Sequence, residues 1–244
     1  MRIRSVTRGQ STGCGRAEWE VCESAQPRLE GVPANRIHLV RHGEVFNPDG
    51  VLYGRIEGFG LSTLGHRMAE SAALALQTEG APIRGLFASP LQRTQESAAP
   101  WSRRFGLEIQ TDQRLIEPTN KFEGRQGDYL KALRRPAEWP WIANPLKPSW
   151  GEAYVSIASR MLAAVETAWQ SVDDGDVVLV SHQLPIWMVH RSLAGQHLFH
   201  DPRRRRCSLS SITSFERRDD AFVELSYRDP AAALQASAVD NGAV

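Results

Sequence analysis

Short apolar runs alternate with helical stripes along the chain. The segments Ile37–Val40, Leu86–Ala88 and Val177–Val180 are largely apolar, and each is bounded by polar or turn-forming residues. Runs of this length without regular polar alternation are typical of strands that are buried on both faces. The pattern therefore predicts three buried strands, of which Val177–Val180 is the clearest.

Helix signals occupy the stretches that follow the first two strands. Ser62 can cap a helix that stops at Gly80 and carries an apolar stripe of Leu64, Met68, Ala72 and Leu76. Ser89 and Pro90 supply an N-cap and a first-turn proline for a second helix, which ends at Gly106.

Two more helices and two more strands complete the predicted body. Apolar residues recur at helical spacing over 152–170, and another helix is expected to follow from Pro185. Further strands are expected over 209–215 and 222–225. Strands that alternate with helices indicate an α/β fold with three layers, in which a mostly parallel sheet has helices on both faces.

The two ends of the chain differ from this body in composition. Residues 1–34 are rich in Arg, Ser and Gly and are predicted to form a flexible N-terminal extension. The folded domain is expected over 35–228, with an irregular loop or insertion rich in Pro and Trp over 118–151. Residues 229–244, rich in Ala and small polar residues, are predicted to be a flexible tail.

Polar side chains follow each of the three buried strands. The first strand leads into Arg41 and His42, the second into Ser89-Pro90 and then Arg93, and the third into His182. Ligands of such sheets bind outside the carboxyl ends of the strands. A single histidine after a strand is more often a capping or surface residue, so the prediction of a site depends on the convergence of all four side chains.

This set of side chains is suited to phosphate. Two arginines can neutralise and orient the oxygens of a phosphoryl group. A neighbouring cation disfavours protonation of imidazole, so one ring nitrogen of His42 keeps a lone pair that can attack phosphorus. We therefore expect Arg41 to hold the group that His42 attacks.

The oxygen that leaves phosphorus needs a proton donor. Glu117 lies in the irregular stretch Arg114–Asn120, and catalytic carboxylates often lie in such segments. Glu44 and Glu123 are alternative acids, between which the residue pattern alone does not decide.

Composition narrows the functional classes. The 28 acidic and 29 basic residues nearly balance, so no overall field favours nucleic acid or a membrane surface. Three scattered cysteines fit neither a disulfide framework nor a zinc site, and no apolar run approaches the roughly 18 residues that a membrane span needs. A cytoplasmic protein is expected, and its oligomeric state is left open.

Five motifs, in order, resemble those of the histidine phosphatase superfamily, also called phosphoglycerate mutase-like. They are Arg41-His42-Gly43 with Glu44, then Gly54-Arg55 with Leu61-Ser62 and Gly65, the stretch SPLQRTQESA from Ser89 to Ala98, Gly151-Glu152-Ala153, and Val180-Ser181-His182. The resemblance as a whole covers residues 36–215 in the expected order, which is far more specific than any one motif.

The resemblance implies a fold and a set of roles. It implies that His42 is phosphorylated, that Arg41, Arg93 and His182 bind the phosphate, and that Glu117 is the acid and base. By the same resemblance Arg55 is a second substrate-side arginine, Asn47 approximates a family asparagine, and no metal or other cofactor is required. The chain departs from the family pattern at Gln183, where a glycine is usual, and in the spacing of Asn47.

The function that this set predicts best is a phosphomonoesterase. The sequence Arg-His-Tyr-Gly, which is the mutase-type signature of the family, is missing after Glu117. Its absence favours a phosphatase over a phosphoglycerate mutase-type transfer. A phosphate-binding sensor without turnover is a third possibility. The expected partner is a phosphorylated small molecule or phosphoprotein, with no nucleic acid and no membrane.

Overall fold

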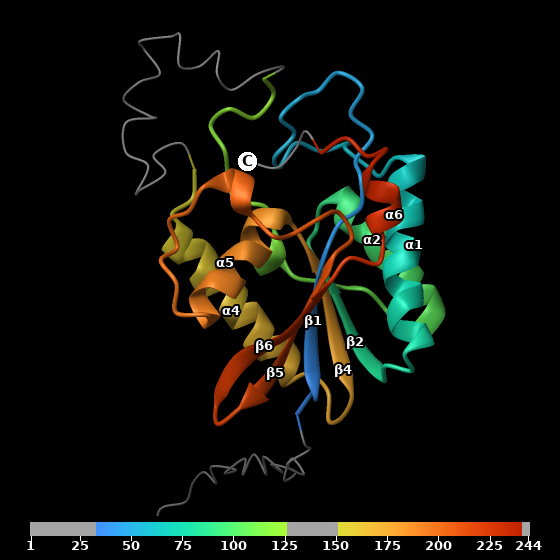
Figure 1. The fold of residues 1–244 in the computed structure, drawn as a ribbon, viewed down its shortest axis with the longest axis vertical. Helices are drawn as coiled ribbons and strands as arrows, with labels where there is room; N and C mark the ends of the chain where they lie inside the picture. The colour runs from blue at the N-terminus through green and yellow to red at the C-terminus, as the bar shows by residue number, and fades with distance from the viewer. Residues whose placement is uncertain (1–32, 126–150, 241–244) are drawn as a thin grey trace, which may run out of the picture. The chain divides into compact units, whose positions relative to one another are not determined.

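The computed structural model describes residues 33–125 and 151–240, which contain a six-stranded sheet (Figure 1). The order across the sheet is β3-β2-β4-β1-β5-β6. Strands β1 to β4 run parallel to one another, whereas β5 runs antiparallel to β1, and β6 runs antiparallel to β5. The strands are β1 (Arg36–Arg41), β2 (Ile83–Ala88), β3 (Gln110–Thr111), β4 (Asp176–Ser181), β5 (Ile212–Arg218) and β6 (Ala221–Arg228).

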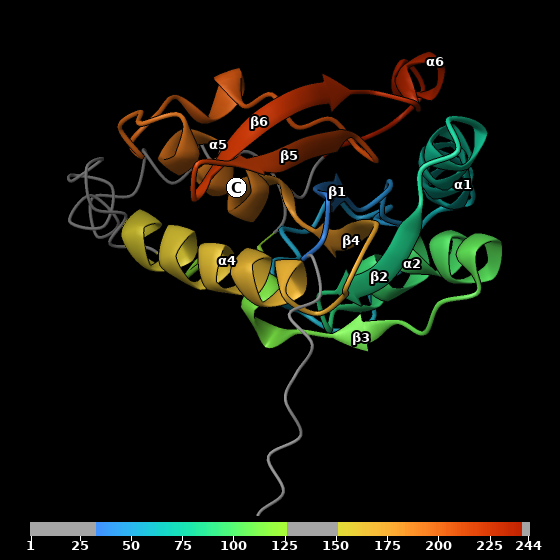
Figure 2. The ribbon, with the colours of Figure 1, turned by 90° about the horizontal axis from the view of Figure 1, so that it is seen from below.

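Helices cover both faces of this sheet, and Figure 2 shows two pairs on opposite sides. One pair is α1 (Thr63–Thr78) and α2 (Gln92–Phe105), and the other is α4 (Tyr154–Trp169) and α5 (Gln183–Leu193). Successive strand residues point to opposite faces. In β1, Leu39 therefore packs in the core cluster of α4 and α5, whereas Val40 packs with α2 and residues of α1. The predicted three-layer α/β fold is confirmed.

The helix boundaries follow the sequence signals at α1 but not at the start of α2. The Ser62 hydroxyl caps α1 by accepting a hydrogen bond from the Gly65 amide at 2.9 Å. The predicted cap at Ser89 is wrong, because α2 begins at Gln92 after Leu91. The Ser89 hydroxyl instead contacts a ring nitrogen of His182. Helix α2 ends before Gly106, which adopts the left-handed conformation that glycine allows.

The remaining elements differ from prediction by a few residues. Helix α5 begins at Gln183 rather than at Pro185, β5 begins and ends three residues later than expected, and β6 extends beyond both ends of its predicted range. The two-residue strand β3 and the single turns η1 (Gln113–Leu115) and η4 (Pro202–Arg204) were not predicted. Such short elements carry too few residues for a periodic pattern to mark them. None of the described helices is long and apolar enough to cross a membrane.

The described residues near the C-terminus contain regular secondary structure. Residues 229–240, which the sequence predicts to be flexible, include the short helix α6 (Ala232–Gln235). At the other end, Ala34 is fully buried, and its amide donates to the Trp169 carbonyl at 3.0 Å. The rest of the predicted extension (1–32) and most of the predicted loop (126–150) lie outside the described residues.

Strand register sets the position of the site. Arg41 pairs with Ser181 between β1 and β4, and Ala88 pairs with Val180 between β2 and β4. The three strands therefore end at the same edge of the sheet, and the residues that follow them emerge side by side there.

Candidate active site

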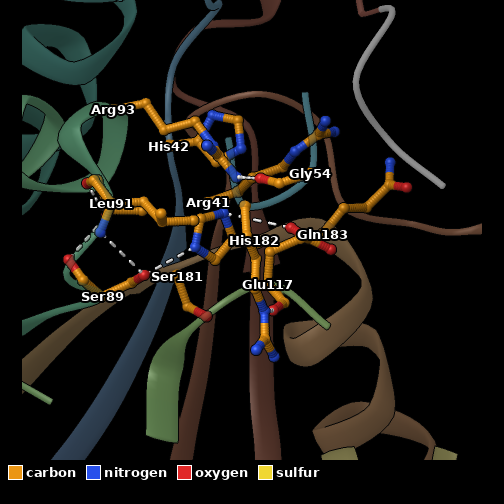
Figure 3. A network of polar contacts seen from close by, with 12 residues as sticks. Arg41, His42, Gly54, Ser89, Leu91, Arg93, Glu117, Ser181, His182 and Gln183 are labelled. Carbon is orange, nitrogen blue, oxygen red and sulfur yellow. Dashed lines mark hydrogen bonds and ion pairs between the residues drawn. The ribbon is translucent and has the colours of Figure 1, made fainter. Parts of the chain in front are cut away.

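Two buried imidazoles face each other at this edge (Figure 3). The ring centroids of His42 and His182 lie 5.2 Å apart with an interplanar angle of 63°. Their exposed fractions are 3% and 0%. The structure thus brings together two histidines that are 140 positions apart in the chain, because β1 and β4 are neighbours in the sheet.

The backbone fixes the tautomer of His42. Its Nδ1 lies 2.7 Å from the carbonyl oxygen of Gly43, which can only accept a hydrogen bond. Nδ1 therefore carries the hydrogen, and Nε2 keeps its lone pair. Gly43 itself must lack a side chain, because a Cβ there would lie 2.4 Å from the carbonyl oxygen of Gly65.

Both histidines are held neutral. Burial is the largest cause that lowers the pKa of His42 well below its usual value, and Arg93 and Arg41 lower it further. Burial, then Arg93 and His42, likewise lower the pKa of His182. A neutral His42 is the form that can act as a nucleophile.

Two arginines, each 1% exposed, lie beside the histidines. Arg41 donates from Nη1 to the Cys207 carbonyl at 2.7 Å and from Nη2 to the Asp240 carboxylate at 2.6 Å. Arg93 donates from Nη2 to the Gly54 carbonyl at 2.8 Å, and its guanidinium stacks 4.7 Å from the centre of the Tyr53 ring.

Three nitrogens in this group have no hydrogen-bond partner within the described part of the chain. They are Nε of Arg41, Nε of Arg93 and Nδ1 of His182, and all three are buried. A buried nitrogen that makes no hydrogen bond is costly. A tetrahedral anion supplies several acceptor oxygens at once, so this set of nitrogens suits a phosphoryl group.

The carboxylate of Glu117 lies against the ring of His182. The residue is 6% exposed, and Oε2 lies 3.2 Å from Nδ1 of His182, although the angle permits no hydrogen bond. Burial raises the pKa of Glu117, against the opposing effect of Arg93 and Arg41. A buried carboxyl with a raised pKa retains its proton at higher pH, as a general acid requires.

Several side chains hold the Glu117 segment in place. The Ser181 hydroxyl donates to the Leu115 carbonyl at 2.7 Å, and Nε of Arg55 donates to the Glu117 carbonyl at 2.5 Å. Arg160 on α4 donates from Nη1 to the Arg114 carbonyl at 2.5 Å. The structure therefore places Arg55 beside Glu117, where it supports the backbone.

The two alternative acids are engaged elsewhere. The Glu44 carboxylate accepts from the Ser62 hydroxyl and from the Val239 amide. The Glu123 carboxylate accepts from the Asn120 amide at 3.1 Å. Neither one contacts a histidine of the site among the described hydrogen bonds and ion pairs, whereas Glu117 does.

Asn47 is not brought into the group of histidines and arginines. Its Nδ2 donates to the Val51 carbonyl at 2.8 Å, and its Oδ1 accepts from the Val51 amide at 3.0 Å. Both ends of the amide therefore close a local turn, which explains an asparagine four residues before Val51. We leave Asn47 out of the proposed site.

Sequence reasoning missed other residues near the site. Ser89, fully buried, lies 2.9 Å from Nε2 of His182. Arg205 lies close enough to Glu117 to lower its pKa, and its own Nε donates to Nε2 of His200 at 2.8 Å. Arg205 stands in a run of four arginines that resembles a solvated loop, so no pattern in the sequence marks it. Only the fold distinguishes it from its neighbours.

A cavity of about 490 Å³ adjoins Arg93. Its lining is mixed, with apolar walls from Phe59, Leu91 and Ile116 and polar groups such as Arg55. Among the described residues, no three or more His, Cys, Asp or Glu side chains are grouped so that they could hold a metal ion.

The model of the histidine phosphatase superfamily, branch 1, matches residues 37–230. The chain belongs to this superfamily. The match runs through β1, β2 and β4, so the histidines and arginines described above lie within the family domain of this histidine phosphatase homologue.

Relatives of this superfamily member come from several bacteria. An uncharacterised protein of Mycobacterium tuberculosis is 49% identical over 198 residues, covering 81% of this chain and 97% of the relative. A probable phosphoglycerate mutase of Yersinia enterocolitica is 28% identical, and the match covers 72% of this chain and 84% of that relative. A solved mycobacterial glucosyl-3-phosphoglycerate phosphatase, in complex with VO3, has a TM-score of 0.61 and 25% identity, covering 78% of this chain and 97% of that one.

Proposed function

We propose that this protein is a phosphomonoesterase that works through a phosphohistidine on His42. The observation that carries the proposal is the set of three buried, unpartnered nitrogens beside a neutral histidine with a free Nε2. The superfamily assignment supports a phosphoryl-transfer enzyme, and the reaction below is built from this chain's own residues.

The first role of the site is to bind the phosphoryl group and neutralise its negative charge. Arg41 and Arg93 donate to its oxygens, and His182 adds a third donor. The Ser89 hydroxyl can donate to Nε2 of His182, so the hydrogen of that ring then lies on Nδ1. Positioning and charge neutralisation supply most of the catalysis in phosphoryl transfer.

Transfer proceeds in two displacements at phosphorus. In the first, the Nε2 lone pair of His42 forms a P–N bond while the P–O bond to the alcohol breaks, and Glu117 gives its proton to the departing oxygen. In the second, water attacks phosphorus, the Glu117 carboxylate takes a proton from that water, and the P–N bond breaks. Inorganic phosphate leaves, and both His42 and Glu117 return to their starting forms.

A phosphatase is favoured over a mutase because the mutase-type signature after Glu117 is absent from the sequence. The name of the Yersinia relative keeps the mutase as the second candidate. The two are separated by assaying 3-phosphoglycerate with and without a bisphosphate primer. Isomerisation that depends on the primer would replace the phosphatase with the mutase.

The test of the proposal is hydrolysis of p-nitrophenyl phosphate by purified protein in EDTA, with His42→Ala as the matched control. We expect turnover by the wild type, because Arg41 and Arg93 supply the positive charge that a metal would otherwise provide, and the neutral His182 adds a hydrogen-bond donor. The variant should be inactive. Phosphate binding without turnover, over a broad panel of phosphate esters, would favour a sensor. Loss of activity in EDTA would contradict metal independence.

The substrate is proposed only by class, as a phosphorylated small molecule or phosphoprotein. The mixed cavity beside Arg93 gives room for the alcohol part of such a substrate. The cytoplasmic location stays a prediction.

A further inference from the structure

The segment after α6 returns to the active site. Leu234 and Ala238 pack against Met68 of α1, and Nε2 of Gln235 donates to the Leu209 carbonyl at 2.8 Å. Both views show α6 beside α1 (Figures 1 and 2). Residues up to Ala238 are therefore fixed to the folded body, and they deliver the next two residues to the edge of the sheet where the histidines lie.

Val239 and Asp240 contact the two residues that flank the Gly43 and His42 pair. The Val239 amide donates to Oε1 of Glu44 at 2.7 Å. Oδ1 of Asp240 accepts from Nη2 of Arg41 at 2.6 Å. The chain thus places its own carboxylate on an arginine that we assign to phosphate binding.

Asp240 is the replaceable partner of Arg41. Arg41 is also fixed by the Cys207 carbonyl and is 1% exposed, so its position does not depend on Asp240 alone. The Asp240 side chain is 36% exposed, and Val239 is 58% exposed. Among the described contacts, two hydrogen bonds hold these two residues, one from the Val239 amide and one from Arg41, which is also an ion pair. A stronger anion at Arg41 can displace them.

A phosphoryl oxygen and the Asp240 carboxylate both accept charge-assisted hydrogen bonds from a guanidinium. They also repel each other, because both are negatively charged. We propose that Asp240 is an internal competitor for phosphate at Arg41, so that residues 239–240 must leave Arg41 before the phosphoryl group is fully held. The inference rests on the proposed role of Arg41 in binding the substrate's phosphate.

The first test measures the Kd of inorganic phosphate by titration calorimetry. Asp240→Asn removes the charge and keeps the size, and a chain that ends at Ala238 removes the whole contact. Asp173→Asn is the matched control, because Asp173 is an exposed carboxylate in the turn before β4, at the opposite end of that strand from His182. Thermal unfolding checks that each variant is folded.

We expect phosphate to bind roughly fivefold more tightly to both tail variants, the low end of couplings between two ligands of one protein. Asp173→Asn should match the wild type. An unchanged Kd, or no phosphate binding at all, would overturn the inference. Weaker binding would also overturn it, because Asp240 would then orient Arg41 rather than compete.

The second test follows hydrogen exchange of the Val239 amide in the wild type. Saturating phosphate should increase exchange there, since displacement of Asp240 also frees the bond to Glu44. Exchange that stays unchanged would contradict displacement. Neither measurement requires turnover. A protein that passes both tests but hydrolyses no ester would therefore contradict the proposed phosphatase function and still support Asp240 as a competitor for phosphate.

Discussion

Replacing Glu117 by glutamine keeps the size of the side chain but removes the proposed proton donor. The residue is 6% exposed, and burial raises the pKa of its carboxyl above the ordinary value of 4.5 despite the nearby arginines. A positioned general acid contributes roughly 10²- to 10⁴-fold to the rate. We expect this full loss in kcat/KM for an alkyl phosphate, whose alkoxide leaves poorly. For p-nitrophenyl phosphate, whose leaving group p-nitrophenolate departs without being protonated, the loss should be about tenfold or less.

The assay compares kcat/KM over a series of leaving groups and over pH. Wild-type activity should fall as pH rises through the pKa of Glu117, because the first step needs the protonated carboxyl. In Glu117→Gln that fall should disappear. Glu44→Gln and Glu123→Gln are matched controls at the two alternative acids. An equal loss for all leaving groups would refute the assignment, and so would a leaving-group effect in either control.

Three further predictions concern the rest of the site. Arg93→Lys should lower kcat/KM for p-nitrophenyl phosphate by about 10²-fold, because an ammonium lacks the directed guanidinium donors; near-normal kinetics would contradict phosphate binding by Arg93. Gly43→Ala should lower the free energy of unfolding in urea by about 2 kcal/mol, because its Cβ would lie 2.4 Å from the Gly65 carbonyl oxygen; an unchanged midpoint would contradict this. As pH falls, kcat/KM should drop only well below 6.5, since burial and the arginines lower the pKa of His42 and its neutral form attacks. A drop that begins at neutral pH would contradict that direction.

The sequence carries enough information for the centre of the site. Arg41, His42 and His182 each follow a buried apolar run, and parallel strands present their carboxyl ends at one edge. Knowledge that these strands share one sheet is therefore sufficient to expect that the side chains meet. The register between β1 and β4 places them at the same level.

The supporting residues could not be predicted in this way. Arg205 and Arg160 reach the Glu117 segment through tertiary packing, and a lone arginine carries no period or spacing that reports such a contact. Ser89 looks like a helix cap by its place before Pro90, yet its hydroxyl contacts His182. Asp240 lies in a stretch of small and polar residues that resembles a tail. Its position beside Arg41 follows from tertiary packing, in which Ala238 contacts the apolar cluster around Met68.

Direct detection of the phosphoenzyme tests the central role of His42 most directly. Wild-type protein is mixed with p-nitrophenyl phosphate, quenched within one turnover in alkaline denaturant that preserves phosphohistidine, digested, and analysed by mass spectrometry. We predict one phosphoryl group on the peptide that contains His42, and none in His42→Ala. A phosphoryl group on His182 or on any other residue, or active turnover by His42→Ala, would contradict the proposed mechanism.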